Sequence, residues 1–239
     1  MERGGEAVSG RIHVIHCGIP IKDWTFVEPR DVVSPLRILS VGALIEKKGH
    51  DSLIRACAFL KKQGMPFECR IVGAGPLEAE LSALVAQFGL HSVVQLVGPQ
   101  PQERIRAELA NADVFVLASR TTADGDTDGI PVSLMEAMAL GIGVVSTKVA
   151  GIPELVKDEV TGFLAEEGDV PALANSILRA AQDGFERRQR VLAARYVIEQ
   201  HFNADVESGK LATLLTRSAL TATAGAWSAS PSQDRCGAP

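Results

Sequence analysis

Short apolar runs alternate with segments of helical period from residue 37 onward, and this alternation constrains the fold more than any other feature of the sequence. The apolar runs are typical of buried strands, and the segments between them carry apolar residues three and four positions apart. Short strands that alternate with helices form a parallel, doubly wound sheet. We therefore expect an α/β, Rossmann-like fold, with strands at 37–44, 68–72, 93–97, 113–118, 143–147 and 162–164 and helices at 51–63, 77–88, 102–111, 132–140 and from Asp169.

Composition narrows the class of protein. Hydrophobic residues make up 46% of the chain, which supports a sizeable core, and the net charge of −5 argues against a nucleic-acid-binding protein. No apolar run approaches the roughly 18 residues of a membrane span, and residues 1–6 lack the pattern of a signal peptide. Cys57 and Cys69 fall in apolar periodic segments without metal-ligand spacing. We expect a cytoplasmic protein.

The pattern divides the chain into four segments. Residues 37–183 form the predicted ligand-binding domain, and 184–220 are predicted to be C-terminal helices. Residues 221–239 are rich in Ala, Ser, Thr, Gly and Pro, which predicts a disordered tail. Residues 1–36 contain one strand-like piece at 12–15 and otherwise lie outside the pattern.

Several loops follow predicted strands and should meet at one edge of the sheet. In a doubly wound sheet, ligands bind beyond the carboxyl ends of the strands. The convergence of these loops predicts a single site, built from residues 44–50, 73–76, 98–102, 119–131 and 148–154.

The segment from Asp128 to Gly141 is the most informative part of that site. Asp128 and Glu136 lie eight positions apart, the first in a loop and the second in a helical segment. Between them, Gly129 allows close approach of a ligand to the backbone, and Pro131 suits the first turn of a helix. Free N–H groups at a helix start bind anions. Carboxylates on either side of an anion site predict a ligand with phosphate in the middle and hydroxyl groups at both ends, such as a nucleotide sugar.

Two glycine turns earlier in the chain belong to the same predicted edge of the sheet. Gly42 follows the first strand and precedes Lys47 and Lys48, either of which can reach a phosphate or belong to an ordinary solvated loop. We favour Lys48, because a residue beside Gly49 can turn inward at the helix start. Gly73 closes the second strand without a full G-x-G-x-x-G pattern, so it is either a tight turn or a turn that also contacts ligand.

Metal binding and hydrolytic chemistry find no support in the sequence. Asp124, Asp126 and Asp128 have the spacing of a calcium loop, but position 12 of that loop is Met135 rather than Glu. We therefore predict no metal site, and we expect Asp124 and Asp126 to be exposed loop charges. The histidines are scattered and form no triad with a serine or cysteine.

Six motifs in order give a resemblance to a known family. They are V-G-A-L-I-E-K-K-G-H, I-V-G-A-G-P-L, A-D-V-F-V-L-A-S, D-G-I-P-V-S-L-M-E-A-M-A-L-G, G-I-P-E-L-V and T-G-F-L. Over residues 11–218 the chain resembles the C-terminal, donor-binding half of a retaining GT-B glycosyltransferase of family 4 (glycosyl transferases group 1), of the exopolysaccharide or lipopolysaccharide type.

The resemblance implies transfer of a hexose from a UDP- or GDP-linked sugar to a saccharide or lipid-linked acceptor, with retention of anomeric configuration and without a cofactor. Asp128 would orient the sugar, Glu136 would bind the ribose, and Lys48 would neutralise the departing diphosphate. Lys48 and Asp128 are thus the implied catalytic residues. The implied donor-binding set is Gly42, Lys47, Lys48, Gly73, Asp128, Gly129, Ile130, Pro131, Leu134 and Glu136.

The sequence departs from the family at two site positions. Asp128 replaces the usual Glu, and Ala43 stands where the family commonly has a diphosphate-binding Arg, so another cation such as Lys47 has to compensate.

The resemblance also implies a partner domain. Residues 1–36 would be the remnant of an interdomain junction, and an N-terminal acceptor domain of about 150 residues is expected to be missing. The alternative function is a nucleotide-sugar binding module that is inactive on its own. Peripheral membrane association of the full-length enzyme, and self-association of the chain through an exposed apolar face, are further expectations.

Overall fold

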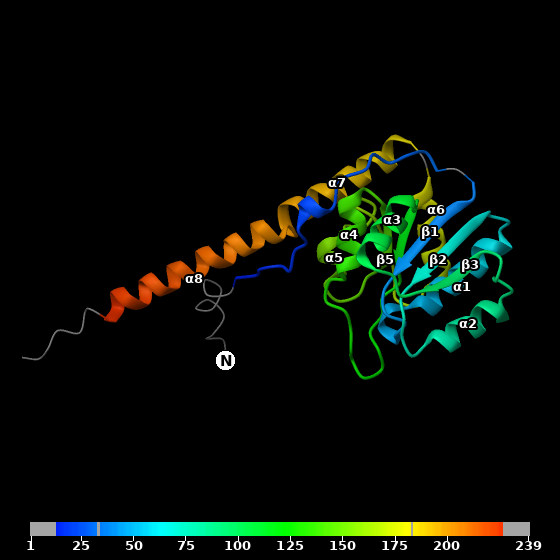
Figure 1. Cartoon of the computed structure of the whole chain (residues 1–239), viewed down its shortest axis with the longest axis horizontal. Helices are drawn as coiled ribbons and strands as arrows, with labels where there is room; N and C mark the ends of the chain where they lie inside the picture. The colour runs from blue at the N-terminus through cyan, green and yellow to red at the C-terminus, as the bar shows by residue number, and fades with distance from the viewer. Residues whose placement is uncertain (1–12, 33, 183, 227–239) are drawn as a thin grey trace, which may run out of the picture.

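The computed structural model describes residues 13–32, 34–182 and 184–226 and shows a six-stranded, wholly parallel sheet with helices on both faces (Figure 1). The strand order is β3-β2-β1-β4-β5-β6, so the chain reverses direction across the sheet between β1 and β4. The predicted doubly wound α/β fold is confirmed. The strands are β1 (Leu36–Val41), β2 (Phe67–Val72), β3 (Val94–Gly98), β4 (Val114–Leu117), β5 (Gly143–Thr147) and β6 (Phe163–Ala165).

Alternation along the buried strands builds two cores, one on each face of the sheet. In β4, Val114 and Val116 point into one core, whereas Phe115 and Leu117 point into the other, because successive side chains of a strand face opposite ways. Helices α1 (His50–Lys62), α2 (Glu78–Gln87) and α6 (Val170–Ala181) cover the first core. The second core is covered by α3 (Gln102–Asn111), α4 (Val132–Leu140), α5 (Ile152–Leu155) and α7 (Phe185–His201).

Local sequence signals explain where several helices begin and end. The side chain of Asp169 accepts a hydrogen bond from the backbone N–H of Ala172, which caps α6 as its N-cap position predicts. Gly141 has φ +92° and ends α4. These signals fix the helix bounds to within a residue or two of the predicted ranges.

Three details of the predicted layout are wrong. The first strand ends at Val41 rather than at residue 44, because the chain turns there into a short 3-10 helix, η3 (Glu46–Lys48). Residues 13–15 form no strand; the N-terminal segment instead makes a single bridge from Ile19 to Asn203. Helix α8 (Ala204–Ala226) extends over residues 221–226 of the segment 221–239 that was predicted to be disordered, and three of these six residues are alanines, which favour helix. Residues 227–239 lie outside the described residues.

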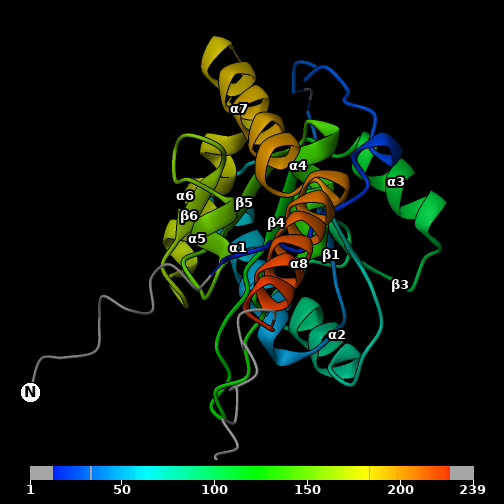
Figure 2. The same ribbon diagram turned by 90° about the vertical axis from the view of Figure 1, so that its left-hand side faces the viewer.

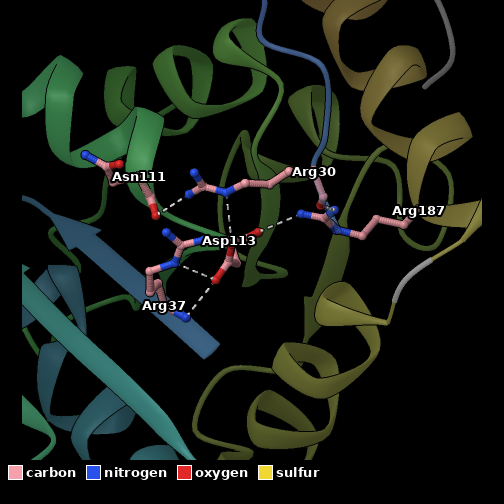
Figure 3. A network of polar contacts seen from close by, with 5 residues as sticks. All are labelled: Arg30, Arg37, Asn111, Asp113 and Arg187. Carbon is pink, nitrogen blue, oxygen red and sulfur yellow. Dashed lines mark hydrogen bonds and ion pairs between the residues drawn. The ribbon is translucent and has the colours of Figure 1, made fainter. Parts of the chain in front are cut away.

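A buried carboxylate ties the N-terminal segment to the sheet at the edge opposite the predicted site (Figure 3). Asp113 is fully buried, and its two oxygens accept hydrogen bonds from Arg37 Nη2 at 2.7 Å and Nε at 3.0 Å. Arg30 approaches the same carboxylate at 3.6 Å, and Arg187 of α7 donates to the backbone oxygens of Arg30 and Asp113. The network therefore connects the N-terminal segment, β1, β4 and α7.

Helix α8 continues roughly in line with α7 and projects beyond the rest of the domain (Figures 1 and 2). Its apolar side chains Val206, Leu211 and Leu215 are exposed. At its start, the buried Glu207 accepts a hydrogen bond from the backbone N–H of His16, which holds the N-terminal segment against the helix. Within the described residues, no helix is long and apolar enough to cross a bilayer.

Candidate functional site

The loops that follow β1, β2 and β4 pack against one another at the carboxyl edge of the sheet. Gly49 has φ +62°, and a Cβ atom on it would lie 1.8 Å from the backbone oxygen of Ala118, just after β4. Gly73 has φ +153°, and its Cβ would lie 1.9 Å from the backbone oxygen of Gly42. Only glycine permits these approaches. The two turns therefore bring the segment that carries the lysines onto the strand end that leads to Asp128.

Two lysines and two carboxylates face each other across this edge. Lys48 Nζ lies 2.7 Å from Asp128 Oδ2, and both side chains are mostly buried, at 17% and 14% exposure. Lys47 Nζ lies 3.0 Å from Asp126 Oδ2 and 3.9 Å from Asp128 Oδ1. The hydrogen bond with Asp126 raises the pKa of Lys47, so this lysine stays charged. The cluster holds two positive and two negative charges.

The position of Gly42 explains how Lys48 reaches the cluster. A Cβ on Gly42 would lie 3.4 Å from Lys48 Cδ, so the aliphatic stem of the lysine runs along the bare glycine backbone. Ala43 is exposed and adds no charge to the site. The guanidinium of Arg120 is bound to Asp51 at the start of α1. Among the described ion pairs, Lys47 is the other cation within 4 Å of Asp128.

Helix α4 begins beside this cluster. Pro131 is its N-cap, no side chain caps the first turn, and the backbone oxygen of Gly129 accepts a hydrogen bond from Gly151 N–H at 3.2 Å. The start of α4 is therefore held by the loop that follows β5. The side chain of Leu134 is fully buried in the second core, because helical spacing places it on the inner face of α4, so Leu134 contributes to the predicted site only through the start of the helix.

Glu136 lies one turn further along α4, on its partly exposed side. Gln102, the first residue of α3, donates a hydrogen bond from Nε2 to Glu136 Oε1 at 3.1 Å. Burial raises the pKa of Glu136, and the hydrogen bond from Gln102 and the charge of Arg106 oppose that rise. A carboxylate thus stands on the α3 side of the helix start, and Asp128 stands on the other.

A buried histidine, His50, links the lysine loop to the end of β1 through two hydrogen-bond contacts. His50 Nε2 lies 3.2 Å from the backbone oxygen of Ala43, and Nδ1 lies 3.4 Å from Ser40 Oγ. Burial lowers the pKa of His50 to about 4, so the ring is neutral at pH 7. In that state Nε2–H donates to the carbonyl oxygen, as the pattern of contacts requires. His50 acts through packing and hydrogen bonding rather than through charge.

The structure brings most of the predicted site residues to one edge of the sheet. Lys47, Lys48 and Asp128 converge as predicted. Asp124 and Asp126 are exposed loop residues, as expected, and Asp126 in addition pairs with Lys47. In the part of the chain that the structure describes, no group of three or more His, Cys, Asp or Glu side chains could hold a metal ion.

Sequence reasoning missed two features of the site. The bond from Gln102 to Glu136 joins residues 34 positions apart, and no local pattern predicts it. A cavity of about 350 Å³ lies on the α2 side of the lysine loop, and no local sequence pattern predicts it either. Its lining residues are Glu46, Asp51, Arg55, Leu77, Glu80, Leu81, Leu84 and Arg120.

Comparisons with solved structures agree with the fold. The crystal structure of Anabaena HepE in complex with UDP superposes with a TM-score of 0.72 and 24% identity, over 86% of this chain and 57% of that chain. The C-terminal domain of LpcC, a glycosyl transferase group 1 family protein from Francisella tularensis, superposes with a TM-score of 0.66 and 21% identity. That match covers 78% of this chain and 99% of the LpcC domain, so the arrangement described here corresponds to a single domain of that protein.

Sequence comparison identifies the family. The amylovoran biosynthesis glycosyltransferase AmsK of Erwinia amylovora is 48% identical over 208 residues, which are 87% of this chain and 51% of AmsK. The chain thus spans about half the length of this relative. Residues 26–196 match the family described as glycosyl transferases group 1. The chain belongs to the glycosyl transferases group 1 family.

Proposed function

We propose that this chain binds the nucleotide-diphosphate sugar for a retaining hexosyltransferase of polysaccharide biosynthesis, with a saccharide or lipid-linked acceptor. The observation that carries the proposal is the cluster of Lys47, Lys48 and Asp128 beside the start of α4. It lies between β1 and β4, where the direction of the sheet reverses. Doubly wound sheets bind their ligands at that point. The family and the amylovoran relative support transfer of a sugar.

The arrangement suits a ligand with a central anion. The diphosphate would lie at the uncapped start of α4, where free N–H groups and the helix dipole favour negative charge. Lys48 would turn from Asp128 to the diphosphate and stabilise the charge that develops as the sugar departs. Asp128, released from Lys48, would accept hydrogen bonds from sugar hydroxyl groups. Glu136 would accept hydrogen bonds from the ribose.

Lys47 would supply the cation that Ala43 cannot. It already lies 3.9 Å from Asp128 Oδ1, and its flexible stem can carry the ammonium group toward a phosphate. Binding is therefore an exchange of partners in which both lysines leave carboxylates. The match covers only 51% of the relative, so donor binding is proposed for this chain and transfer for the whole protein. We propose that the whole protein is cytoplasmic and has GT-B architecture.

The proposal is tested by calorimetric titration of the chain with UDP, GDP and ADP. We expect saturable binding of one nucleotide, weakened about tenfold or more in Lys48→Ala, because a charge-assisted hydrogen bond to phosphate is worth about 1.5–3 kcal/mol. Glu136→Ala should weaken the same nucleotide. Lys62→Ala is the matched control, since Lys62 is an exposed lysine at the end of α1, away from the cluster.

Absence of binding to all three nucleotides by the wild-type chain would contradict the proposal, as would an equal loss in Lys48→Ala and Lys62→Ala. Retention is a separate measurement on the longer protein. The anomeric proton coupling in the product should match that of the nucleotide sugar supplied, and inversion would contradict the mechanism.

A further inference from the structure

The two carboxylate oxygens of Glu136 differ in their contacts, because only one of them is hydrogen-bonded to Gln102 among the described residues. Gln102 Nε2 donates to Oε1 at 3.1 Å. In the described contacts, no protein donor reaches Oε2. A hydrogen bond to one oxygen restricts rotation of the carboxylate and leaves the other oxygen able to accept from a ligand hydroxyl group.

The position of Gln102 in the fold makes this contact specific. Gln102 is the first residue of α3. This helix follows β3, the strand at one border of the sheet, and packs against α4. The loop before α3 thus delivers the amide to the same carboxyl edge that carries the lysine cluster. Glu136 lies on the partly exposed side of α4, whereas its neighbours Met135 and Ala137 are buried in the second core.

The charge environment points the same way. Glu136 is partly buried, and this burial raises its pKa. The Gln102 hydrogen bond and the positive charge of Arg106 both favour the ionised form. Arg106 lies over the ring of Trp24, with its Cζ atom 5.0 Å from the ring centroid, so its position is set by packing. Gln102 is therefore the described group that donates a hydrogen bond to this carboxylate, and the bond both restrains Oε1 and opposes the rise of the pKa.

We infer that Gln102 is a positioning residue: it orients Glu136 so that the free oxygen binds the ribose hydroxyl groups of a nucleoside diphosphate. This inference rests on the proposed function and deepens it, because it assigns a determinant of ribose recognition to the loop before α3. The effect of Gln102 reaches the ligand through Glu136. It should disappear when either the carboxylate or the hydroxyl groups are removed.

The test is a titration of wild-type chain, Gln102→Leu, Glu136→Gln and the double variant with UDP and GDP, and with the 2′,3′-dideoxy form of whichever binds. Gln102→Leu should weaken the ribonucleotide about tenfold, equivalent to about 1.4 kcal/mol. It should change affinity for the dideoxynucleotide less than twofold, and it should add less than twofold to the loss in Glu136→Gln. Gln87→Leu, at an exposed glutamine at the end of α2, is the matched control.

A second measurement needs no ligand. In an NMR titration of the free protein, the Glu136 carboxyl pKa should rise in Gln102→Leu and stay unchanged in Gln87→Leu. Circular dichroism checks that each variant folds.

The outcomes separate this inference from the proposed function. If wild-type chain binds a nucleotide and Gln102→Leu binds it equally well, or loses ribo- and dideoxy forms alike, Gln102 is not a positioning residue. If wild-type chain binds neither UDP nor GDP, the ribose role falls together with the assignment of these nucleotides as ligands.

Discussion

Asp113 offers the sharpest test of what holds the N-terminal segment to the domain. Its carboxylate is fully buried and accepts two hydrogen bonds from the Arg37 guanidinium and one from the Arg37 backbone N–H at 2.9 Å. Replacement by alanine removes every acceptor at once. The perturbation leaves the charge of Arg37 and a backbone donor without their partner (Figure 3).

The cost can be worked out from these contacts. Removal of one partner of a buried ion pair costs about 3–5 kcal/mol. The Arg37 side chain is 30% exposed, so its charge can be partly rehydrated, which favours the lower end of that range. We expect Asp113→Ala to lower the free energy of unfolding by about 3 kcal/mol, which for a domain of this size lowers the melting temperature by about 6–12 °C.

The assay is urea denaturation followed by circular dichroism. Asp31→Ala is the matched control, because Asp31 is 81% exposed and lies 3.8 Å from Arg188, a surface pair worth about 0–1 kcal/mol. A loss below about 1 kcal/mol in Asp113→Ala, or losses of equal size in the two variants, would refute the reasoning.

Two further predictions concern the lysine loop. The pKa of His50 is lowered to about 4 in the folded state, whereas an unfolded histidine titrates near 6.5. Between these values only the unfolded state binds a proton at His50, so the free energy of unfolding is full above pH 6.5 and falls by about 3 kcal/mol as the pH drops to about 4. In chemical denaturation across this range, His50→Gln should lack this dependence of stability on pH. An unchanged dependence would disprove the lowered pKa of His50. Gly49→Ala should cost about 2 kcal/mol or more, because its Cβ would collide with the Ala118 backbone oxygen. Gly64→Ala should cost only about 1 kcal/mol, since its φ is +72° and nothing lies within 4 Å of the added carbon; thermal melts showing equal losses would mean that the loop gives way.

Much of the fold could be predicted from the sequence because its signals are local. Buried strands such as β5 and helices such as α4 follow directly from short apolar runs and helical spacing. Helix starts and ends follow from residues such as Asp169 and Gly141. The end of β1 could not be predicted this way, because apolar residues continue past Val41 while the ladder of the sheet does not.

The candidate site was predicted as a set of residues but not as a set of contacts. The rule that strand ends meet at one edge brings Lys48 and Asp128 together without any knowledge of their side chains. The pairing of Lys47 with Asp126 and of Gln102 with Glu136 depends on the positions of separate loops in the folded protein, which no local sequence pattern predicts. For Leu134, helical spacing explains why the side chain faces the core although the residue belongs to the helix start.

The position of the site between β1 and β4 also determines which strand pairing has to form before the lysines and Asp128 can meet. The lysines follow β1 and Asp128 follows β4, with β2, α2, β3 and α3 between them along the chain. The first three strands pair with one another through short crossovers, but a sheet made of these strands alone would lack Asp128 and so have no cluster. Only when the fourth strand docks beside the first, closing the longest loop in the sheet, do the charges meet. The site therefore depends on a non-local strand pairing, and a chain in which β4 has not paired with β1 lacks the assembled cluster.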